Sequence, residues 1–93
     1  MTPQEFEVSV LAEGYNPVVH IDRALGYSLA DHQHTFDACA LITAGEFTIT
    51  VDGISRSYKV GEIFRLQAGI VHQESAGPQG VSYLAGRRER GAA

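Results

Sequence analysis

From residue 40 onward, apolar and polar residues alternate along the chain in short runs, and glycine-containing turns separate those runs. Alternation of this kind predicts half-buried strands. The expected strands cover residues 40–42, 46–51, 54–60, 63–66, 71–75 and 81–85, with a short β-branched strand at 17–22 that begins at a proline. Asp52-Gly53 between two alternating runs predicts a type I′ hairpin. Short strands with frequent turns indicate an antiparallel sandwich or barrel, hence an all-β fold.

The beginning of the chain follows a different pattern. Thr2-Pro3-Gln4-Glu5 has the form of a capping box, in which the Thr and Glu side chains bond to backbone N–H groups at the start of a helix. Phe6 and Val10 recur at helical spacing, and Gly14 is placed to end the helix in a left-handed conformation. We therefore expect a short N-terminal helix within residues 1–14 that packs on the outside of the barrel.

Length and composition allow one domain with a modest core. The chain has 93 residues, of which 44% are hydrophobic and 19% charged, as in an ordinary globular domain. No segment has the roughly 18–20 apolar residues that cross a bilayer, and the N-terminus lacks a signal-peptide pattern. We therefore expect a cytoplasmic protein with no membrane partner. The single cysteine, Cys39, excludes an internal disulfide and is expected to be a small buried residue.

The net charge of −4 is unevenly distributed. Residues 1–86 carry 4 basic and 10 acidic side chains, a balance of −6, whereas three arginines gather in residues 87–93. A negatively charged body repels a phosphate backbone, which argues against nucleic-acid binding. We expect residues 15–86 to form the barrel and residues 87–93 to be a basic, frayed tail; an anion contact by the tail arginines is the alternative.

Glycines and histidines recur at fixed distances between residues 26 and 76. The first segment contains Gly26, the five residues YSLAD, His32-Gln33-His34 and Gly45; the second contains Gly61, Gly69 and His72, after an interval of 15 residues, 46–60. This spacing resembles the two motifs of the cupin family, G-x5-HxH-x3,4-E-x6-G and G-x5-PxG-x2-H-x3-N. The sequence departs from them at Ala38 in the glutamate slot, Gln67 in the proline slot and Ala76 in the asparagine slot.

The resemblance implies a double-stranded β-helix, the cupin jelly-roll barrel, with a divalent metal ion bound inside by His32, His34 and His72. The residue chemistry agrees, because imidazole is a common metal ligand and two histidines at i and i+2 project from one face of an extended strand. Histidine suits Fe, Mn, Ni, Zn and Cu alike, so the identity of the ion stays open. A barrel that keeps the histidines and binds no metal is the alternative.

Alanine at position 38 cannot supply the family's carboxylate ligand. Asp37 would do so if a bulge after His34 turned it into the barrel, whereas regular alternation points it outward. Water or substrate is the other candidate, an arrangement that resembles the three-histidine sites of some thiol and diketone dioxygenases of the cupin family. Glu74 follows His72 by two residues on the same strand face. There it could act as a general base, orient a ligating histidine, or face solvent at the barrel mouth.

Four further side chains are candidates for the lining of a small-molecule pocket: Tyr27, Phe36, Gln67 and Tyr83. The aromatic members of this set could equally belong to the core. The fourth histidine, His20, lies outside both motifs and is expected to be a partly exposed strand residue.

Two classes of function follow from these expectations. One is a metal-dependent enzyme acting on a small molecule in a dioxygenase-like, isomerase-like or lyase-like reaction, with the dioxygenase type favoured. The other is a non-catalytic module that binds or senses a small ligand, with or without metal. A homodimer is the expected assembly, by the family resemblance and because a small barrel gains buried area when two copies pair.

Overall fold

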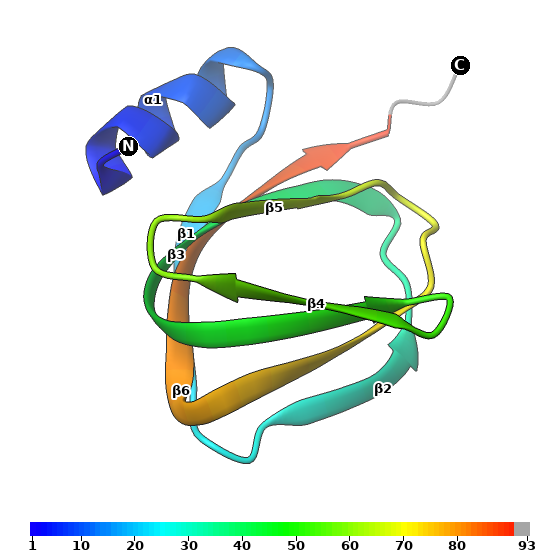
Figure 1. Cartoon of the computed structure of the whole chain (residues 1–93). Coiled ribbons are helices and arrows are strands. Elements are labelled where there is room, and N and C mark those ends of the chain that lie inside the picture. The colour runs from blue at the N-terminus through cyan, green and yellow to red at the C-terminus, as the bar shows by residue number, and fades with distance from the viewer. Residues whose placement is uncertain (91–93) are drawn as a thin grey trace.

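The computed structural model describes residues 1–90, which form one helix and six strands (Figure 1). The elements are α1 (Pro3–Ala12), β1 (Val18–Arg23), β2 (Ser28–His32), β3 (Phe36–Val51), β4 (Ile54–Lys59), β5 (Ile63–Leu66) and β6 (His72–Glu89). Two of them, β3 and β6, are much longer than the rest and pair with each other in antiparallel fashion over most of their length. This pair forms the spine on which the shorter strands are arranged.

Each half of a long strand belongs to a different side of the barrel. The first half of β3 pairs with β5 and its second half with β4. The first part of β6 pairs with β2 and its last part with β1. The strands therefore form two layers joined by the bent β3–β6 pair, and the curved ribbons enclose an interior (Figure 1). This arrangement confirms the expected all-β barrel with an N-terminal helix.

The bend in β3 lies at two register shifts, between Ile42 and Ala44 and between Gly45 and Phe47. Gly45 has a φ of +73°, and a Cβ there would collide with the backbone carbonyl of Gly80 on β6. Only glycine allows the two chains to approach this closely. The expectation of separate strands at 40–42 and 46–51, and at 71–75 and 81–85, is therefore wrong. In both cases the turn signals mark a bend within a continuous strand.

Two local predictions are confirmed by the backbone. Asp52 and Gly53, between β3 and β4, both have positive φ, at 51° and 76°, as a type I′ turn requires. In the capping box, the Thr2 hydroxyl accepts a hydrogen bond from the Glu5 N–H at 3.1 Å, and the Glu5 carboxylate accepts one from the Thr2 N–H at 2.9 Å. Over residues 1–90, no helix has the length and apolar character needed to cross a bilayer.

Strand alternation in β3 divides the apolar residues into two clusters. Cys39 and Leu41 point outward and pack against Phe6 and Val10 of α1, which holds the helix on the outer surface of the barrel. The intervening residues point inward and join the interior cluster, whose members are Ala40, Ile42, Phe47, Ile49, Phe64, Val81 and Tyr83. The buried position of Cys39 matches the expectation from its sequence neighbours.

The structure differs from the sequence prediction at two further places. The expectation that His32 and His34 project from one strand is wrong, because β2 ends at His32 and His34 lies in the connection that follows. The extent of β2 was not predicted either, since its residues are exposed or only half-buried and lack the alternation that identifies a strand. Residues 87–89 were expected in a frayed tail, yet they pair with Phe36–Ala38 as the end of β6. Backbone pairing across strands distant in sequence orders this segment. Residues 91–93 of the expected tail lie outside the described part of the chain.

Candidate metal centre

Three histidines converge at one end of the barrel interior. His32 is the last residue of β2 and His72 the first residue of β6, and the two lie directly opposite each other in the antiparallel ladder. His34 comes from the connection between β2 and β3. One ligand nitrogen from each ring lies within 4.8 Å of those of the other two, a spacing from which all three can reach one ion. The predicted convergence of the two motifs is confirmed.

Hydrogen bonds fix the orientation of two of the rings. Nδ1 of His32 lies 2.8 Å from the carbonyl of Ala30, and Nδ1 of His72 lies 2.9 Å from the carbonyl of Ile70. A carbonyl only accepts, so each Nδ1 is the donor, and in the neutral form of each ring the lone pair is at Nε2. Both Nε2 atoms are buried and have no hydrogen-bond partner among residues 1–90. Two oriented and unpaired imidazole lone pairs are what a metal ion requires.

The third ring, His34, is held by packing. Its ring stacks on Phe36 with centroids 4.8 Å apart and an angle of 24° between the planes. Burial lowers the pKa of His34 below its ordinary value, and the neighbouring His72 and His32 lower it further. A lowered pKa keeps the imidazole neutral near neutral pH, and only neutral imidazole binds a metal.

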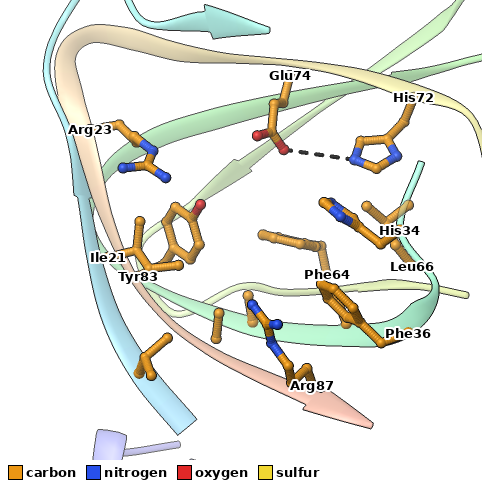
Figure 2. A pocket seen from close by; sticks show the side chains of 14 residues that line it. Ile21, Arg23, His34, Phe36, Phe64, Leu66, His72, Glu74, Tyr83 and Arg87 are labelled. Atoms are coloured by element: carbon orange, nitrogen blue, oxygen red, sulfur yellow. Dashed lines mark ion pairs between the residues drawn. The ribbon is translucent and has the colours of Figure 1, made fainter. Parts of the chain in front are cut away.

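One carboxylate accompanies the three histidines. The Oε1 atom of Glu74 lies 3.9 Å from Nε2 of His32. Its Oε2 atom lies 3.8 Å from Nε2 of His72, the contact drawn as a dashed line in Figure 2. The Tyr27 hydroxyl donates a hydrogen bond of 2.7 Å to Oε1, and burial followed by the contact with Glu74 raises the pKa of Tyr27. With only 13% of its side chain exposed, Glu74 is an interior group rather than a solvated residue at the barrel mouth.

Asp37 does not join this group, so of the two alternatives the structure has the outward orientation of regular alternation and not the bulge that would turn Asp37 toward the histidines. Its carboxylate accepts hydrogen bonds from the Ala68 N–H at 2.9 Å, from Arg90 at 2.8 Å and from Arg88 at 3.2 Å. These contacts lower the pKa of Asp37, and the hydrogen bond from the Ala68 N–H has the largest effect. Regular alternation is preserved, because Ala38 next to it lines the interior. Asp37 ties the end of β6 to the connection that precedes it.

A cavity of about 190 Å³ extends from the histidines into the barrel (Figure 2). Most of the cavity wall is apolar. The wall is formed by Val19, Ile21, Arg23, His34, Phe36, Ala38, Ala40, Phe64, Leu66, His72, Glu74, Tyr83, Ala85 and Arg87. Phe36 and Tyr83 therefore line the cavity. Gln67 does not, because it is exposed in the connection after β5, and Tyr27 contacts Glu74 without being part of the wall. Burial, and then the charge of Glu74, raise the pKa of Tyr83 to about 12, which keeps its hydroxyl protonated.

Two arginines in the cavity wall, Arg23 and Arg87, were missed by the sequence analysis. Arg23 continues the alternation of Val19 and Ile21 by one step, so extending the predicted strand by a single residue would have placed it on the same face. Arg87 was assigned to a solvated tail because no local pattern marks the end of β6. Its position depends on the pairing of β6 with β3.

No protein-family model matches the sequence, and no curated protein does either. The fold, however, is similar to that of many solved structures. An RmlC-like cupin from Shewanella frigidimarina NCIMB 400 aligns with a TM-score of 0.68 at 22% identity, over 83% of this chain and 69% of its own.

A cupin superfamily protein from Desulfitobacterium hafniense DCB-2 aligns with a TM-score of 0.64 at 21% identity, over 82% of this chain and 81% of its own. KdgF from a Halomonas species aligns with a TM-score of 0.64 at 21% identity, over 78% of this chain and 68% of its own. At this level of identity the similarity concerns the fold alone. The chain therefore has the cupin fold, a double-stranded β-helix of jelly-roll type.

Proposed function

We propose that the protein binds a divalent metal ion through His32, His34 and His72 and uses it to transform a small molecule in the adjoining cavity. The observation that carries this proposal is the pair of buried Nε2 atoms, on His32 and His72, that have no hydrogen-bond partner among the described residues. Leaving such a nitrogen unpaired costs about 1–3 kcal/mol, and a bound cation removes that cost. The donor set of imidazole nitrogens with a nearby carboxylate suits Fe, Mn, Ni, Zn or Cu.

When bound, such an ion supplies a Lewis acid that polarises a coordinated small molecule or water. The protein's own groups define the rest of the site. Ala38 occupies the slot of the family's glutamate and lines the cavity with only a methyl group, so it leaves space beside the histidines for that molecule. The apolar wall, which includes Phe64 and Leu66, limits water around it and strengthens the electrostatic interactions there.

Glu74 is the group that we assign to proton transfer. Its carboxylate lies within 4 Å of the Nε2 atoms of both His32 and His72, and it faces the cavity. The Tyr27 hydroxyl holds Oε1 in place, so that the carboxylate can accept a proton from a bound molecule in a fixed geometry. Glu74 favours a reaction that includes a proton transfer, of the isomerase or lyase type, over the dioxygenase type that the ligand count alone suggested.

The experiment that tests the metal is elemental analysis of protein purified without a histidine tag. We expect about one divalent ion per chain after dialysis against Zn²⁺ or Mn²⁺, and none in a His32→Ala, His34→Ala, His72→Ala triple variant. His20→Ala is the matched control, because His20 is exposed and its ring contacts Asp22 on the outer surface, away from the three histidines. Equal and negligible metal in the wild type and the triple variant would refute the proposal.

A further inference from the structure

The charged groups of the cavity wall indicate what kind of molecule enters it. Three of the other arginines of the described chain are compensated: Arg65 pairs with Glu13, and Arg88 and Arg90 pair with Asp37, whereas Arg56 lies over the Tyr58 ring outside the cavity. The two cavity arginines, Arg23 and Arg87, have no carboxylate within ion-pair distance among residues 1–90. Both arginines are exposed residues that also line the cavity, and a guanidinium without a carboxylate partner beside a mostly apolar cavity is a recognition element for a negative group.

Arg87 is held next to the candidate metal centre. Its guanidinium lies 4.2 Å from the centre of the Phe36 ring, and Phe36 in turn stacks on His34. Figure 2 shows the Arg87 side chain rising from β6 beside Phe36 and directed into the cavity. This stacking restricts the arginine and leaves the hydrogen-bond donors at the edge of its guanidinium free for a ligand.

Alanine at position 38 leaves Arg87 without a carboxylate partner at the facing position of the neighbouring strand. Ala38 of β3 lies directly opposite Arg87 of β6 in the antiparallel ladder, and both side chains face the cavity. Side chains at such opposed positions have Cβ atoms about 4.5–5.5 Å apart, so a glutamate at 38 would pair with Arg87 and neutralise it. The residue that departs from the family motif thus opens space in the wall and leaves the cation available.

We infer that the cavity binds a small organic monoanion with an apolar body, whose carboxylate pairs with the guanidinium of Arg87. Glu74 repels a second negative charge in the same cavity, which favours a monoanionic carboxylate over a dianionic phosphate. The apolar body contacts Phe64, Leu66 and the neighbouring wall. The inference rests on the proposed function only for the end of the molecule that meets the histidines.

The test uses benzoate and benzamide, which share an apolar ring and differ in charge. Each is titrated into Zn²⁺-loaded and metal-free protein, and binding is followed by NMR chemical shifts. We expect benzoate to bind about tenfold more tightly than benzamide to the wild type, as a charged hydrogen bond contributes. Arg87→Gln should remove that preference by weakening benzoate binding more than benzamide binding, whereas Arg87→Lys, which keeps the charge without the planar fork, should retain part of the preference.

Arg56→Gln is the matched control, because Arg56 also lies over an aromatic ring, that of Tyr58, but outside this cavity. It should keep the benzoate preference. An unchanged preference in Arg87→Gln would overturn the inference, since benzoate would then be held by the metal or another group. If the protein binds no zinc, an Arg87-dependent preference in the metal-free form still supports the anion site, and the metal proposal alone fails.

Discussion

Replacing His72 by leucine separates the contribution of this side chain to packing from its contribution to metal binding. His72 is only 2% exposed, and its Nε2 atom has no hydrogen-bond partner among the described residues, while its Nδ1–H donates to the carbonyl of Ile70. Leucine has a similar volume and brings no polar atom into the interior. The substitution therefore relieves one unpaired buried nitrogen and removes one hydrogen bond.

The two terms have known sizes. An unpaired buried polar atom costs about 1–3 kcal/mol, and an ordinary hydrogen bond contributes about 0.5–1.5 kcal/mol. In the metal-free protein, His72→Leu should thus change the free energy of unfolding by roughly −0.5 to +2.5 kcal/mol, where a positive value is stabilising. In the presence of zinc the wild type should be the more stable of the two proteins. Free Zn²⁺ at about 100 times its dissociation constant stabilises the wild type by about 2.7 kcal/mol and leaves the variant unchanged.

Urea unfolding, followed by circular dichroism in EDTA and in excess zinc, measures both effects. In thermal unfolding of a chain of this length, the stabilisation of the wild type by zinc corresponds to a rise in melting temperature of about 10–20 °C. His20→Leu should respond to zinc as the wild type does, because His20 lies on the exposed outer face. The reasoning is refuted if His72→Leu destabilises the EDTA-treated protein by more than about 2 kcal/mol, or if zinc stabilises the variant equally.

Four further outcomes are expected. Gly53→Ala should destabilise the protein by about 1 kcal/mol, and Gly45→Ala should destabilise it by more. Both glycines have positive φ, but a Cβ at Gly45 would also collide with the backbone of Gly80; thermal unfolding of the two variants measures the difference. Tyr27→Phe should weaken zinc binding about tenfold in calorimetry by freeing Glu74, with Tyr58→Phe unchanged. Because the pKa of Asp37 is lowered in the fold, the Asp37 carboxylate stabilises the protein fully above the ordinary carboxyl pKa range, and this stabilisation is lost as the pH falls through the lowered pKa. The difference in free energy of unfolding between the wild type and Asp37→Asn should therefore disappear in urea titrations at acid pH. Sedimentation at micromolar concentration should show a dimer, and a monomer would contradict the expected assembly.

The features that the sequence predicted correctly are those set by local chemistry. The capping box at Thr2 and Glu5, the turn at Asp52-Gly53 and strand β5 each depend on residues close together in the chain. The proximity of His34 to His72 is a long-range feature, but the fixed spacing of the two motifs predicted it. Local preference and motif spacing thus account for most of the fold and for the three histidines.

The features that the sequence did not predict depend on pairing between distant strands. No apolar–polar alternation marks residues 28–32 as a strand, and in residues 1–90 the strand β2 pairs with β6. The same holds for Arg87, whose place in the wall follows from the register with β3. For Glu74, alternation indicated the correct strand face, but its depth in the barrel follows from how the two layers enclose the interior. Register and enclosure are properties of the whole barrel.

The departure at Ala38 connects these observations. In the family motif a glutamate from β3 would stand beside the histidines; here the carboxylate nearest to them, that of Glu74, comes from β6, two residues after His72. The exchange changes both charge and space, because the wall opposite Arg87 carries a methyl group instead of a carboxylate. A cation left unpaired in this way favours an anionic molecule at the point where the wall is open. We therefore expect the alanine at position 38, which removes the family's carboxylate ligand, also to favour the binding of an anionic small molecule beside Arg87.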